Sequence, residues 1–262
     1  MDETIVTLYQ RINKLWRIFA TAFCFSLFGL GGLTLTFIIF PLLTFSIKEV
    51  SQRELQVQKI IQRAFSLFCD TMRFLGALDY RIEGAEKLQL DKNCLLIANH
   101  PSLIDYVLIA SRLKQCDCLV KAAIWHNPFM KGVVKSAGYI PNNGAQELIE
   151  HCAKRLNDGN VLLIFPEGTR TTPGKHSVLQ RGAAQIAIKT ATDIRMIHIH
   201  VSPPFLTKET KWYQVPDIKP FFHVQVKDKL SIQPFIDSHL PPSVAVRNLN
   251  RHLSDLFPPD HT

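Results

Sequence analysis

His100 and Asp105 lie five positions apart in the stretch NHPSLID, residues 99–105. A histidine can take a proton from an attacking hydroxyl while a carboxylate fixes its second ring nitrogen and stabilises the imidazolium. Such base catalysis needs no serine nucleophile. The same spacing also arises by chance, and many histidines at strand ends only hydrogen-bond the backbone. Base catalysis by this His-x4-Asp pair is therefore a hypothesis that needs further support from the chain.

The two side chains can meet only if a turn separates them. Five residues of continuous helix would leave them about 140° apart around the helix axis. Residues 94–98 form an apolar run that is typical of a short buried strand, and Pro101 ends it. Ser102 can then cap a helix over residues 103–113. This arrangement predicts His100 in the turn and Asp105 in the first helical turn.

A second apolar run, residues 161–165, ends in the polar motif FPEGTR. Ligands of open α/β sheets bind beyond the carboxyl ends of the strands. Pro166 and Gly168 bracket a tight turn that exposes backbone N–H groups, and Arg170 brings a planar guanidinium suited to phosphate or carboxylate. We expect an anion site here. The alternative is a surface ion pair between Glu167 and Arg170, which would contribute little energy.

The two motifs, in this order, resemble those of the glycerolipid acyltransferase family, the lysophosphatidic acid acyltransferase-like proteins. The resemblance extends over about residues 75–230 and is sharpest in NHPSLID and FPEGTR. It implies that His100 is the general base that activates an acceptor hydroxyl, and that Asp105 orients it. It also implies an O-acyltransferase of phospholipid biosynthesis, which uses acyl-CoA or acyl carrier protein as acyl donor and needs no further cofactor.

The resemblance also implies a set of residues that bind the acceptor phosphate. Their core is the Glu-Gly-x-Arg portion of the second motif, with Thr169 in its variable position, and two basic residues from neighbouring segments join it. The set is Glu167, Gly168, Thr169, Arg170, Lys121 and Arg181.

A third block of the family, KAAIWHNPFMKGVVKSAGYI, begins at Lys121. After it the family usually has an aspartate and an arginine, but this chain has Pro141-Asn142-Asn143. A neutral amide lacks the charge assistance that makes hydrogen bonds to phosphate about twice as strong. Arg181 can supply part of the missing charge. The expected acceptor, lysophosphatidic acid, therefore has an alternative, a specialised lipid, glycolipid or polyene, and a non-catalytic lipid-binding protein is the alternative of another class.

Residues 18–46 contain no charged side chain. A helix of this length reaches about 43 Å, enough to cross a hydrocarbon core of about 30 Å with tilt. The run is longer than that of a signal peptide, so we expect it to be retained as a membrane helix. Its glycines and Pro41 also permit a kinked segment within one leaflet. Basic residues lie on both sides, so charge does not settle the orientation.

The net charge of +8 favours anionic lipid as a partner. No nucleic-acid partner is expected, because the basic residues are dispersed and no nucleic-acid-binding signature occurs. The six cysteines show neither disulfide nor zinc spacing, which favours reduced thiols. His198 and His200 share a strand face but lack a third ligand at a recognisable spacing, so no metal is expected. Thioester donors are cytosolic, so we expect the cell inner membrane, with the catalytic domain facing the cytoplasm.

The body of the chain alternates β-rich runs with helical segments, which predicts a single α/β acyltransferase domain with a mixed sheet and helices on both faces. The predicted strands are residues 80–82, 94–98, 118–121, 161–165, 194–201 and 222–226, and the predicted helices are 146–156, 178–190 and 244–256. The predicted division is an N-terminal membrane anchor at 1–46, an amphipathic helical connector at 47–76, the acyltransferase domain at 77–230 and a C-terminal extension at 231–262. The connector either docks on the domain or lies on the membrane surface.

Overall fold

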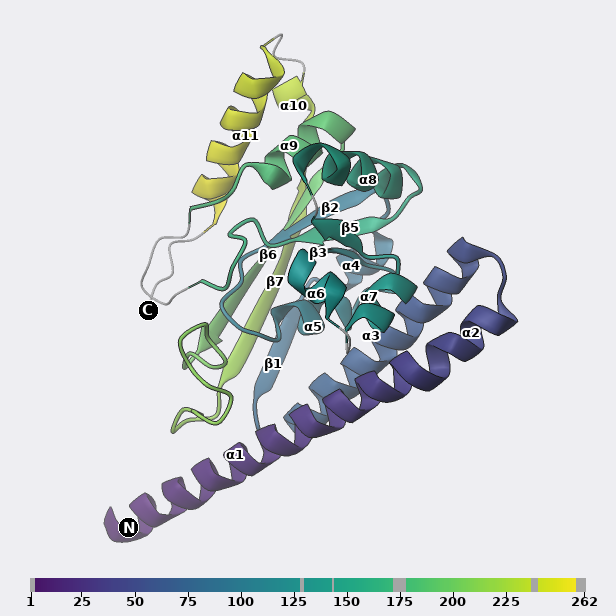
Figure 1. Ribbon diagram of the computed structural model, residues 1–262. Helices are drawn as coiled ribbons and strands as arrows, with labels where there is room; N and C mark the ends of the chain where they lie inside the picture. The colour runs from purple at the N-terminus through teal and green to yellow at the C-terminus, as the bar shows by residue number, and fades with distance from the viewer. Residues whose placement is uncertain (1–2, 128–129, 143, 172–177, 237–239, 258–262) are drawn as a thin grey trace.

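A computed structural model describes residues 3–127, 130–142, 144–171, 178–236 and 240–257. The chain begins with one long helical segment made of α1 (Glu3–Thr34), the π-helical turn η1 (Leu35–Ile39) and α2 (Phe40–Ser46). Helix α3 (Val50–Phe74) then returns antiparallel to it, so that the two form a hairpin along the lower side of the molecule in Figure 1. The glycines of α1 remain helical, and the irregular turn falls at η1 instead.

Seven strands form one mixed sheet in the order β1-β7-β6-β2-β5-β3-β4. They are β1 (Asp79–Glu83), β2 (Cys94–Ala98), β3 (Asp117–Lys121), β4 (Ile140–Asn142), β5 (Val161–Ile164), β6 (Ile194–Ser202) and β7 (Phe221–Leu230). Only β6 and β7 pair antiparallel among these neighbours. The predicted α/β class with a mixed sheet is confirmed. Strand β4 was not predicted, because it has three residues and a proline at its centre.

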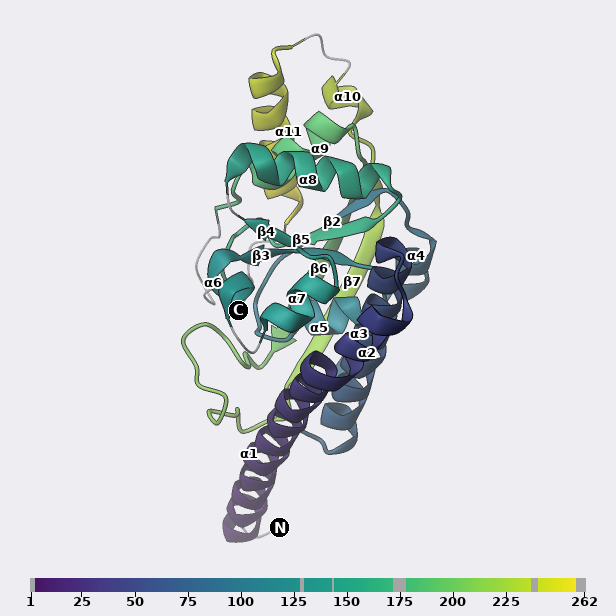
Figure 2. The same cartoon turned by 45° about the vertical axis from the view of Figure 1, so that its right-hand side comes forward.

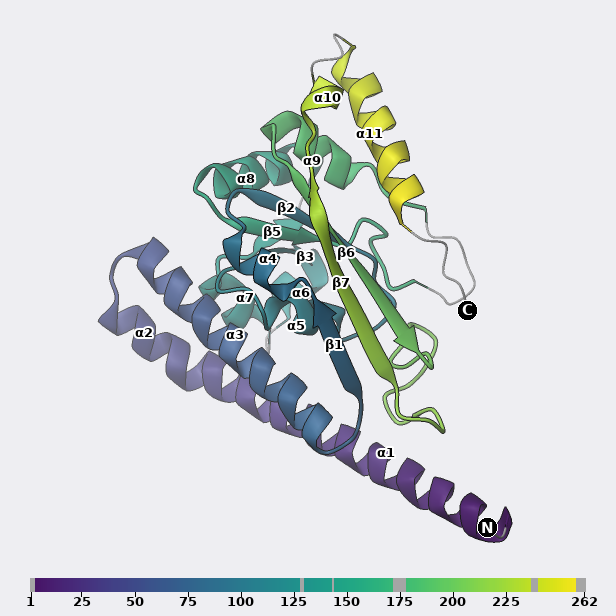
Figure 3. The ribbon, with the colours of Figure 1, turned by 180° about the vertical axis from the view of Figure 1, so that it is seen from behind.

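Helices cover both faces of the sheet. On one face α8 (Ala145–Asn157), α9 (Gly182–Thr190) and α11 (Pro242–Leu256) pack on Leu95, Ile97 and Leu162. On the other face α4 (Ala85–Leu90) and α5 (Asp105–Ala110) pack on Leu96 and Leu163, and α4 lies in front of the sheet in Figure 3. Strands β2 and β5 are consequently buried at every position. The remaining short helices are α6 (Ala122–His126), α7 (Lys131–Ser136) and α10 (Gln233–Ile236).

The predicted connector, now α3, docks on the domain. Its residues Phe68 and Met72 share a buried cluster with Ala20 and Cys24 of α1. The same cluster contains buried apolar residues of the domain. Figure 2 shows α1 and α3 side by side. Helix α11, from the predicted C-terminal extension, packs with α9 in the main core. The division of the chain into four parts stays a prediction.

The outer side of the N-terminal helix is apolar. Residues Leu8–Ser46 form a helical segment long and apolar enough to cross a membrane. The exposed large apolar side chains on it include Leu15, Trp16, Phe19, Phe23, Leu27, Leu30, Phe37, Ile38, Leu42 and Phe45. Water would meet this surface at a free-energy cost of about 25 cal/mol for every Å² of apolar area. The helix therefore indicates that the chain associates with a membrane.

Candidate active site

The predicted site residues gather at one edge of the sheet. Strands β2, β3, β4 and β5 run parallel, so their carboxyl ends meet at that edge. His100 follows β2 and the FPEGTR motif follows β5. The backbone N–H of Thr171 donates to the carbonyl oxygen of His100 at 2.7 Å. The two motifs, which lie far apart along the chain, are thus joined directly.

The predicted pair forms. Nδ1 of His100 lies 2.9 Å from Oδ2 of Asp105. The backbone N–H of Ser102 donates to the same carboxylate oxygen at 2.7 Å. Asp105 is the first residue of α5, so the prediction of a helix that begins at residue 103 with Ser102 as its cap is wrong. The helix begins two residues later than expected, and the backbone N–H of Ser102 donates to the Asp105 carboxylate, so Asp105 and not Ser102 supplies the side-chain acceptor in this turn.

The two members of the pair differ in exposure. The Asp105 side chain is fully buried, whereas 21% of the His100 side chain is exposed. Burial raises the pKa of Asp105 to about 6, against the lowering effect of the His100 hydrogen bond. When Nδ1 carries the proton that Asp105 accepts, Nε2 of the imidazole keeps its lone pair. The geometry therefore suits a base at Nε2.

Two residues that sequence reasoning did not single out hold the histidine in place. The ring of Phe165 stacks on the His100 ring, with centroids 4.2 Å apart. The side-chain amide of Asn99 pairs with the backbone of Ile199 in β6 by two hydrogen bonds of 2.7 Å. Both residues stand inside the two motifs, at the strand ends that deliver the site, which is the signal that could have identified them.

Glu167 is directed into the protein. Only 8% of the residue is exposed, so the alternative of a surface ion pair is wrong for this carboxylate. Its Oε1 accepts the backbone N–H of His100 at 3.1 Å, and its Oε2 accepts a short hydrogen bond from the Thr171 hydroxyl. The carboxylate therefore braces the histidine turn. Contact between Glu167 and an acceptor phosphate stays a prediction.

Arg170 is fixed at one end of its guanidinium. Nη1 donates to the carbonyl oxygens of Leu206 at 3.0 Å and Thr207 at 2.7 Å. The Leu206 carbonyl also accepts the backbone N–H of Leu103 at 3.0 Å. Within the described part of the chain, both side-chain hydrogen bonds of Arg170 use Nη1. The other guanidinium nitrogens can therefore bind an anion in the forked geometry that arginine offers.

The turn before Arg170 requires a glycine. Gly168 has a φ of +69°, and a Cβ at this position would lie 2.6 Å from Nε2 of Gln180. The backbone N–H of Gln180 donates to the Pro166 carbonyl at 2.8 Å, which fixes the start of α9 beside the turn. Thr169 and Arg181 are both exposed there. The turn and the first residue before α9 are thus both accessible from solvent.

Lys121 is the last residue of β3, so its backbone lies at the same edge of the sheet. The position of its side chain lies outside what the structure describes, as does Asn143. Asn142 is exposed at the end of β4. Among the described residues, no group of three or more histidine, cysteine, aspartate and glutamate side chains could hold a metal ion. His198 instead packs against Phe257, with ring centroids 5.4 Å apart.

Known proteins resemble this chain in sequence and in fold. Residues 79–204 match the family model described as acyltransferase. The 1-acyl-sn-glycerol-3-phosphate acyltransferase of Borreliella burgdorferi is 26% identical over 141 residues, which is 52% of this chain and 56% of that protein. That of Helicobacter pylori is 29% identical over 128 residues, 46% of this chain and 54% of that protein. The chloroplastic LPAT1 of Arabidopsis thaliana is 27% identical over 119 residues, 43% of this chain and 33% of that protein.

The matched segments thus span between 33% and 56% of these relatives. A crystal structure of the 1-acyl-sn-glycerophosphate (LPA) acyltransferase PlsC from Thermotoga maritima aligns with a TM-score of 0.65. Its sequence is 17% identical, and the alignment covers 94% of this chain and 97% of that one, so the two share a fold. With both motifs at one sheet edge in this fold, residues 79–204 are identified as a domain of the acyltransferase family, and the chain is similar to 1-acyl-sn-glycerol-3-phosphate acyltransferases of that family.

Proposed function

We propose that this protein is an O-acyltransferase of phospholipid biosynthesis. It moves a fatty acyl group from acyl-CoA or acyl carrier protein to the hydroxyl of lysophosphatidic acid. The observation that carries the proposal is the pair of His100 Nδ1 and Asp105 Oδ2 at 2.9 Å, which shares a sheet edge with Arg170. A base for a hydroxyl and a cation for a phosphate are the two groups that such an acceptor needs.

The reaction needs one base and no covalent intermediate. Nε2 of His100 takes the proton of the acceptor hydroxyl as its oxygen attacks the thioester carbonyl carbon. Asp105 stabilises the imidazolium that forms. The tetrahedral intermediate then collapses, the carbon–sulfur bond breaks, and the leaving thiolate takes the proton from the imidazolium. The products are the acylated acceptor and the free thiol of the carrier.

The acceptor phosphate binds beside the base. Arg170 contributes the guanidinium nitrogens other than Nη1, which have no hydrogen-bond partner among the described residues, and Gly168 and Thr169 contribute the exposed turn before it. Arg181 and Lys121 add positive charge from the start of α9 and the end of β3. Glu167 acts through the backbone of His100, since both its oxygens accept hydrogen bonds from that region.

A second acceptor class has support from one observation. Asn142 is exposed at the same sheet edge and places a neutral amide where the family usually has charge. An amide can bind a sugar hydroxyl or a phosphate oxygen. A specialised lipid, glycolipid or polyene acceptor is therefore the alternative. A lipid-binding protein without activity fits less well, because it would not need the buried carboxylate that orients His100.

The protein acts at the cell inner membrane, with the catalytic domain on the cytoplasmic side where thioester donors are found. The inner side of the N-terminal segment packs on α3 and the domain at Ala20, Cys24 and Phe40. A segment that crossed the bilayer upright would draw this polar domain into the hydrocarbon, where charged groups are costly. The contacts favour a segment that lies within one leaflet, the alternative to a single spanning helix.

The test is acyl transfer in membranes that contain either the wild-type chain or His100→Ala. Lysophosphatidic acid is offered with labelled acyl-CoA and, separately, with labelled acyl carrier protein. We expect labelled phosphatidic acid with the wild type and not with the variant, and the donor comparison identifies the carrier. If neither donor gives product while the wild-type chain is folded, the lysophosphatidic acid assignment is wrong and glycolipid or polyene acceptors follow.

A further inference from the structure

The connection between β6 and β7, residues 203–220, forms a long surface loop beside the N-terminal half of α1 (Figures 1 and 3). We call it the β6–β7 loop. Its outer part exposes 47% of Trp212 and 73% of Ile218, and Tyr213 lies beside Trp212 with ring centroids 5.5 Å apart. Exposed apolar and aromatic side chains that lie together in one loop indicate a surface that binds a partner.

The loop is attached to α1 at defined positions. Nη2 of Arg17 donates to the carbonyl oxygens of Pro216 at 3.0 Å and Asp217 at 2.6 Å. Nζ of Lys14 lies 2.7 Å from Oδ1 of Asp217. Val215 is buried in the same cluster as Ala20 and Cys24 of α1. The loop therefore keeps its place relative to the N-terminal helix.

These attachments set the level of the loop relative to a bilayer. Lys14 and Arg17 are the last basic residues before the uncharged stretch 18–46. Cations at such a boundary stay at the level of the lipid headgroups, because the hydrocarbon excludes them. The part of the loop that is bonded to them must lie at the same level.

The exposed side chains of the loop suit that environment. Tryptophan and tyrosine are enriched at the membrane–water interface, where the ring is apolar and one edge is polar. Lys208, Lys211 and Lys219 are exposed on the loop, Lys219 also pairs with Asp79 at 3.3 Å, and all three would lie near anionic headgroups. Of the two acidic residues of the loop, Asp217 is paired with Lys14 and Glu209 is exposed, so the three lysines outnumber the carboxylates. Charge and apolar surface thus point to one partner, an anionic lipid surface.

We propose that the β6–β7 loop is a second lipid-contact surface, which binds the headgroup layer of an anionic membrane next to α1. The proposal rests on the membrane attachment in the proposed function and goes beyond it. The first part of the same loop carries the Leu206 and Thr207 carbonyls that hold Arg170. Lipid contact and the candidate phosphate-binding arginine are therefore linked by a single loop.

Tryptophan emission tests the contact without reference to acyl transfer. The chain has three tryptophans, Trp16, Trp125 and Trp212, so replacement of the others by phenylalanine gives single-tryptophan variants. The Trp212-only and Trp16-only chains are reconstituted in phosphatidylglycerol vesicles that contain brominated lipid. A matched control replaces all three tryptophans by phenylalanine and carries Leu240→Trp. Leu240 is 44% exposed and lies at the α10–α11 end, far from α1 (Figure 1).

We expect bromine near the headgroup to quench Trp212 and Trp16, and to leave the control tryptophan unquenched. If Trp16 is quenched but Trp212 is not, the loop contact is refuted while attachment through α1 stands. If neither is quenched in the folded chain, the membrane attachment fails as well. Quenching at the control position would show indiscriminate adsorption and would also overturn the proposal.

The lysines test the choice of an anionic partner. In the Trp212-only chain, we expect Lys211→Gln with Lys219→Gln to weaken the quenching of Trp212. The matched control, Lys92→Gln with Lys189→Gln, removes the same charge from exposed positions outside the loop and should leave the quenching unchanged. Equal quenching in both pairs, or in vesicles of phosphatidylcholine alone, would contradict an anionic lipid surface as the partner.

Discussion

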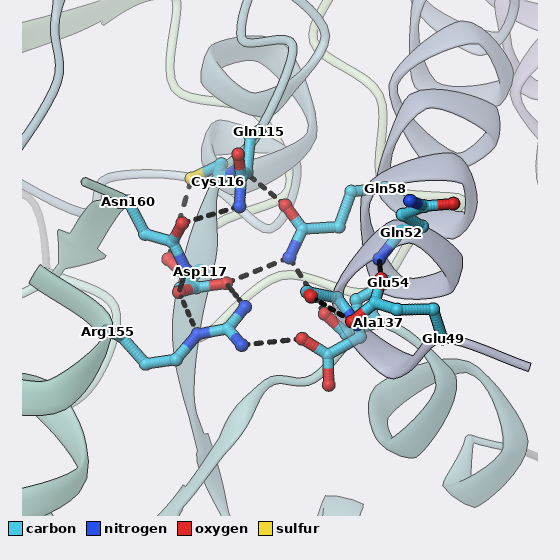
Figure 4. A network of polar contacts seen from close by, with 11 residues as sticks. Glu49, Gln52, Glu54, Gln58, Gln115, Cys116, Asp117, Ala137, Arg155 and Asn160 are labelled. Atoms are coloured by element: carbon cyan, nitrogen blue, oxygen red, sulfur yellow. Dashed lines mark hydrogen bonds and ion pairs between the residues drawn. The ribbon is translucent and has the colours of Figure 1, made fainter. Parts of the chain in front are cut away.

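Two regions of the molecule each bury a carboxylate, and they treat it differently. Asp117 lies at the start of β3 and is bound by polar side chains in a network that we call the charge network (Figure 4). Its other members are Glu54, Gln58, Arg155 and Asn160. Arg155 binds its carboxylate with two hydrogen bonds of 2.6 Å and 2.8 Å. Gln58 and Asn160 donate to it at 2.8 Å and 2.9 Å. Both oxygens are thus fully engaged by a permanent cation and two amides.

Asp105 in the candidate active site has fewer partners. Its Oδ2 accepts from His100 and Ser102, while Oδ1 has no hydrogen-bond partner among the residues that the structure describes. Burial raises the pKa of Asp105 to about 6. In the charge network, by contrast, burial lowers the pKa of Arg155 but the bonds to Asp117 and Glu54 raise it further, so the cation is permanent.

The difference separates a structural use of buried charge from a chemical one. Arg155 joins β3 to α3 through Asp117 and Glu54, and thereby holds the N-terminal hairpin on the domain. A partner that never titrates gives a bond that holds at every ordinary pH. The partner of Asp105 is an imidazole, which can take up and release a proton at a ring nitrogen. That pair can move a proton.

The largest expected effect is on catalysis. Asp105→Asn keeps the shape of the side chain but removes the charge that stabilises the imidazolium and fixes its tautomer. We expect acyl transfer to fall by about 10³- to 10⁴-fold. The thermal midpoint should stay the same or rise, because a buried carboxylate is lost. Initial rates and a thermal melt on the same preparation check both halves, and a melt that collapses along with the rate would assign Asp105 a structural role.

The opposite pattern is expected in the charge network. Asp117→Ala leaves the Arg155 guanidinium buried without its main partner, which costs about 3–5 kcal/mol in the free energy of unfolding. The rate per folded molecule should change little. Urea unfolding measures the first quantity and acyl transfer at low temperature the second. Lys87→Ala, which removes an exposed ion pair with Asp228, is the control and should cost far less, because solvent screens such a pair. An Asp117→Ala chain as stable as this control would remove the contrast between the two regions.

The pH dependence sharpens the comparison further. The folded-state pKa of Asp105, about 6, lies above its ordinary value of 3.8, so the folded chain binds this proton more tightly than the unfolded chain. The resulting stabilisation is present at low pH and is lost as the pH rises from about 4 to about 6, by up to about 3 kcal/mol. Urea unfolding across this range should show that slope in the wild type relative to Asp105→Asn. Parallel curves for the two chains would rule out a raised pKa.

Activity should change with pH in the opposite direction. Uptake of a proton by the His100–Asp105 pair removes the base, so acyl transfer should fall as the pH drops through about 6. The pH profile of kcat/KM for the free enzyme measures this. The two predictions together require the free energy of unfolding to decrease over the same pH range in which kcat/KM increases. That pattern would show that the ionised Asp105 carboxylate is needed for activity and costs stability.

The smallest effect is expected at the candidate phosphate contact. Arg170→Lys keeps the charge but loses the fork that binds Leu206, Thr207 and an anion together. We expect KM for the lipid acceptor to rise by about 10-fold, with kcat less affected, because a charged hydrogen bond contributes about 1.5–3 kcal/mol. Arg181→Lys, on an exposed residue, is the control with a smaller change. Equal changes in KM for acceptor and donor would count against a phosphate contact.

Much of the site was readable from the residues because its parts are local. Residues 94–98 form β2 as predicted, and 161–165 contains β5, since short continuous apolar runs bounded by polar turns mark buried parallel strands. The motif that follows each strand was also visible, and parallel strands bring such motifs to one edge. The histidine–aspartate spacing required a turn, and the structure has one.

The tertiary structure decided what depends on distant partners. Asp117 meets Arg155, Asn99 meets Ile199, and Phe165 lies under the His100 ring only because strand order and register place them there. The three-residue strand β4 is too short to show a periodic pattern in the sequence. No sequence pattern indicates either that the Asp105 carboxylate, and not the Ser102 hydroxyl, is the acceptor at the start of α5. Apolar periodicity and turn residues act over a few positions and are legible in sequence, whereas polar contacts between remote segments arise only when the whole sheet is assembled.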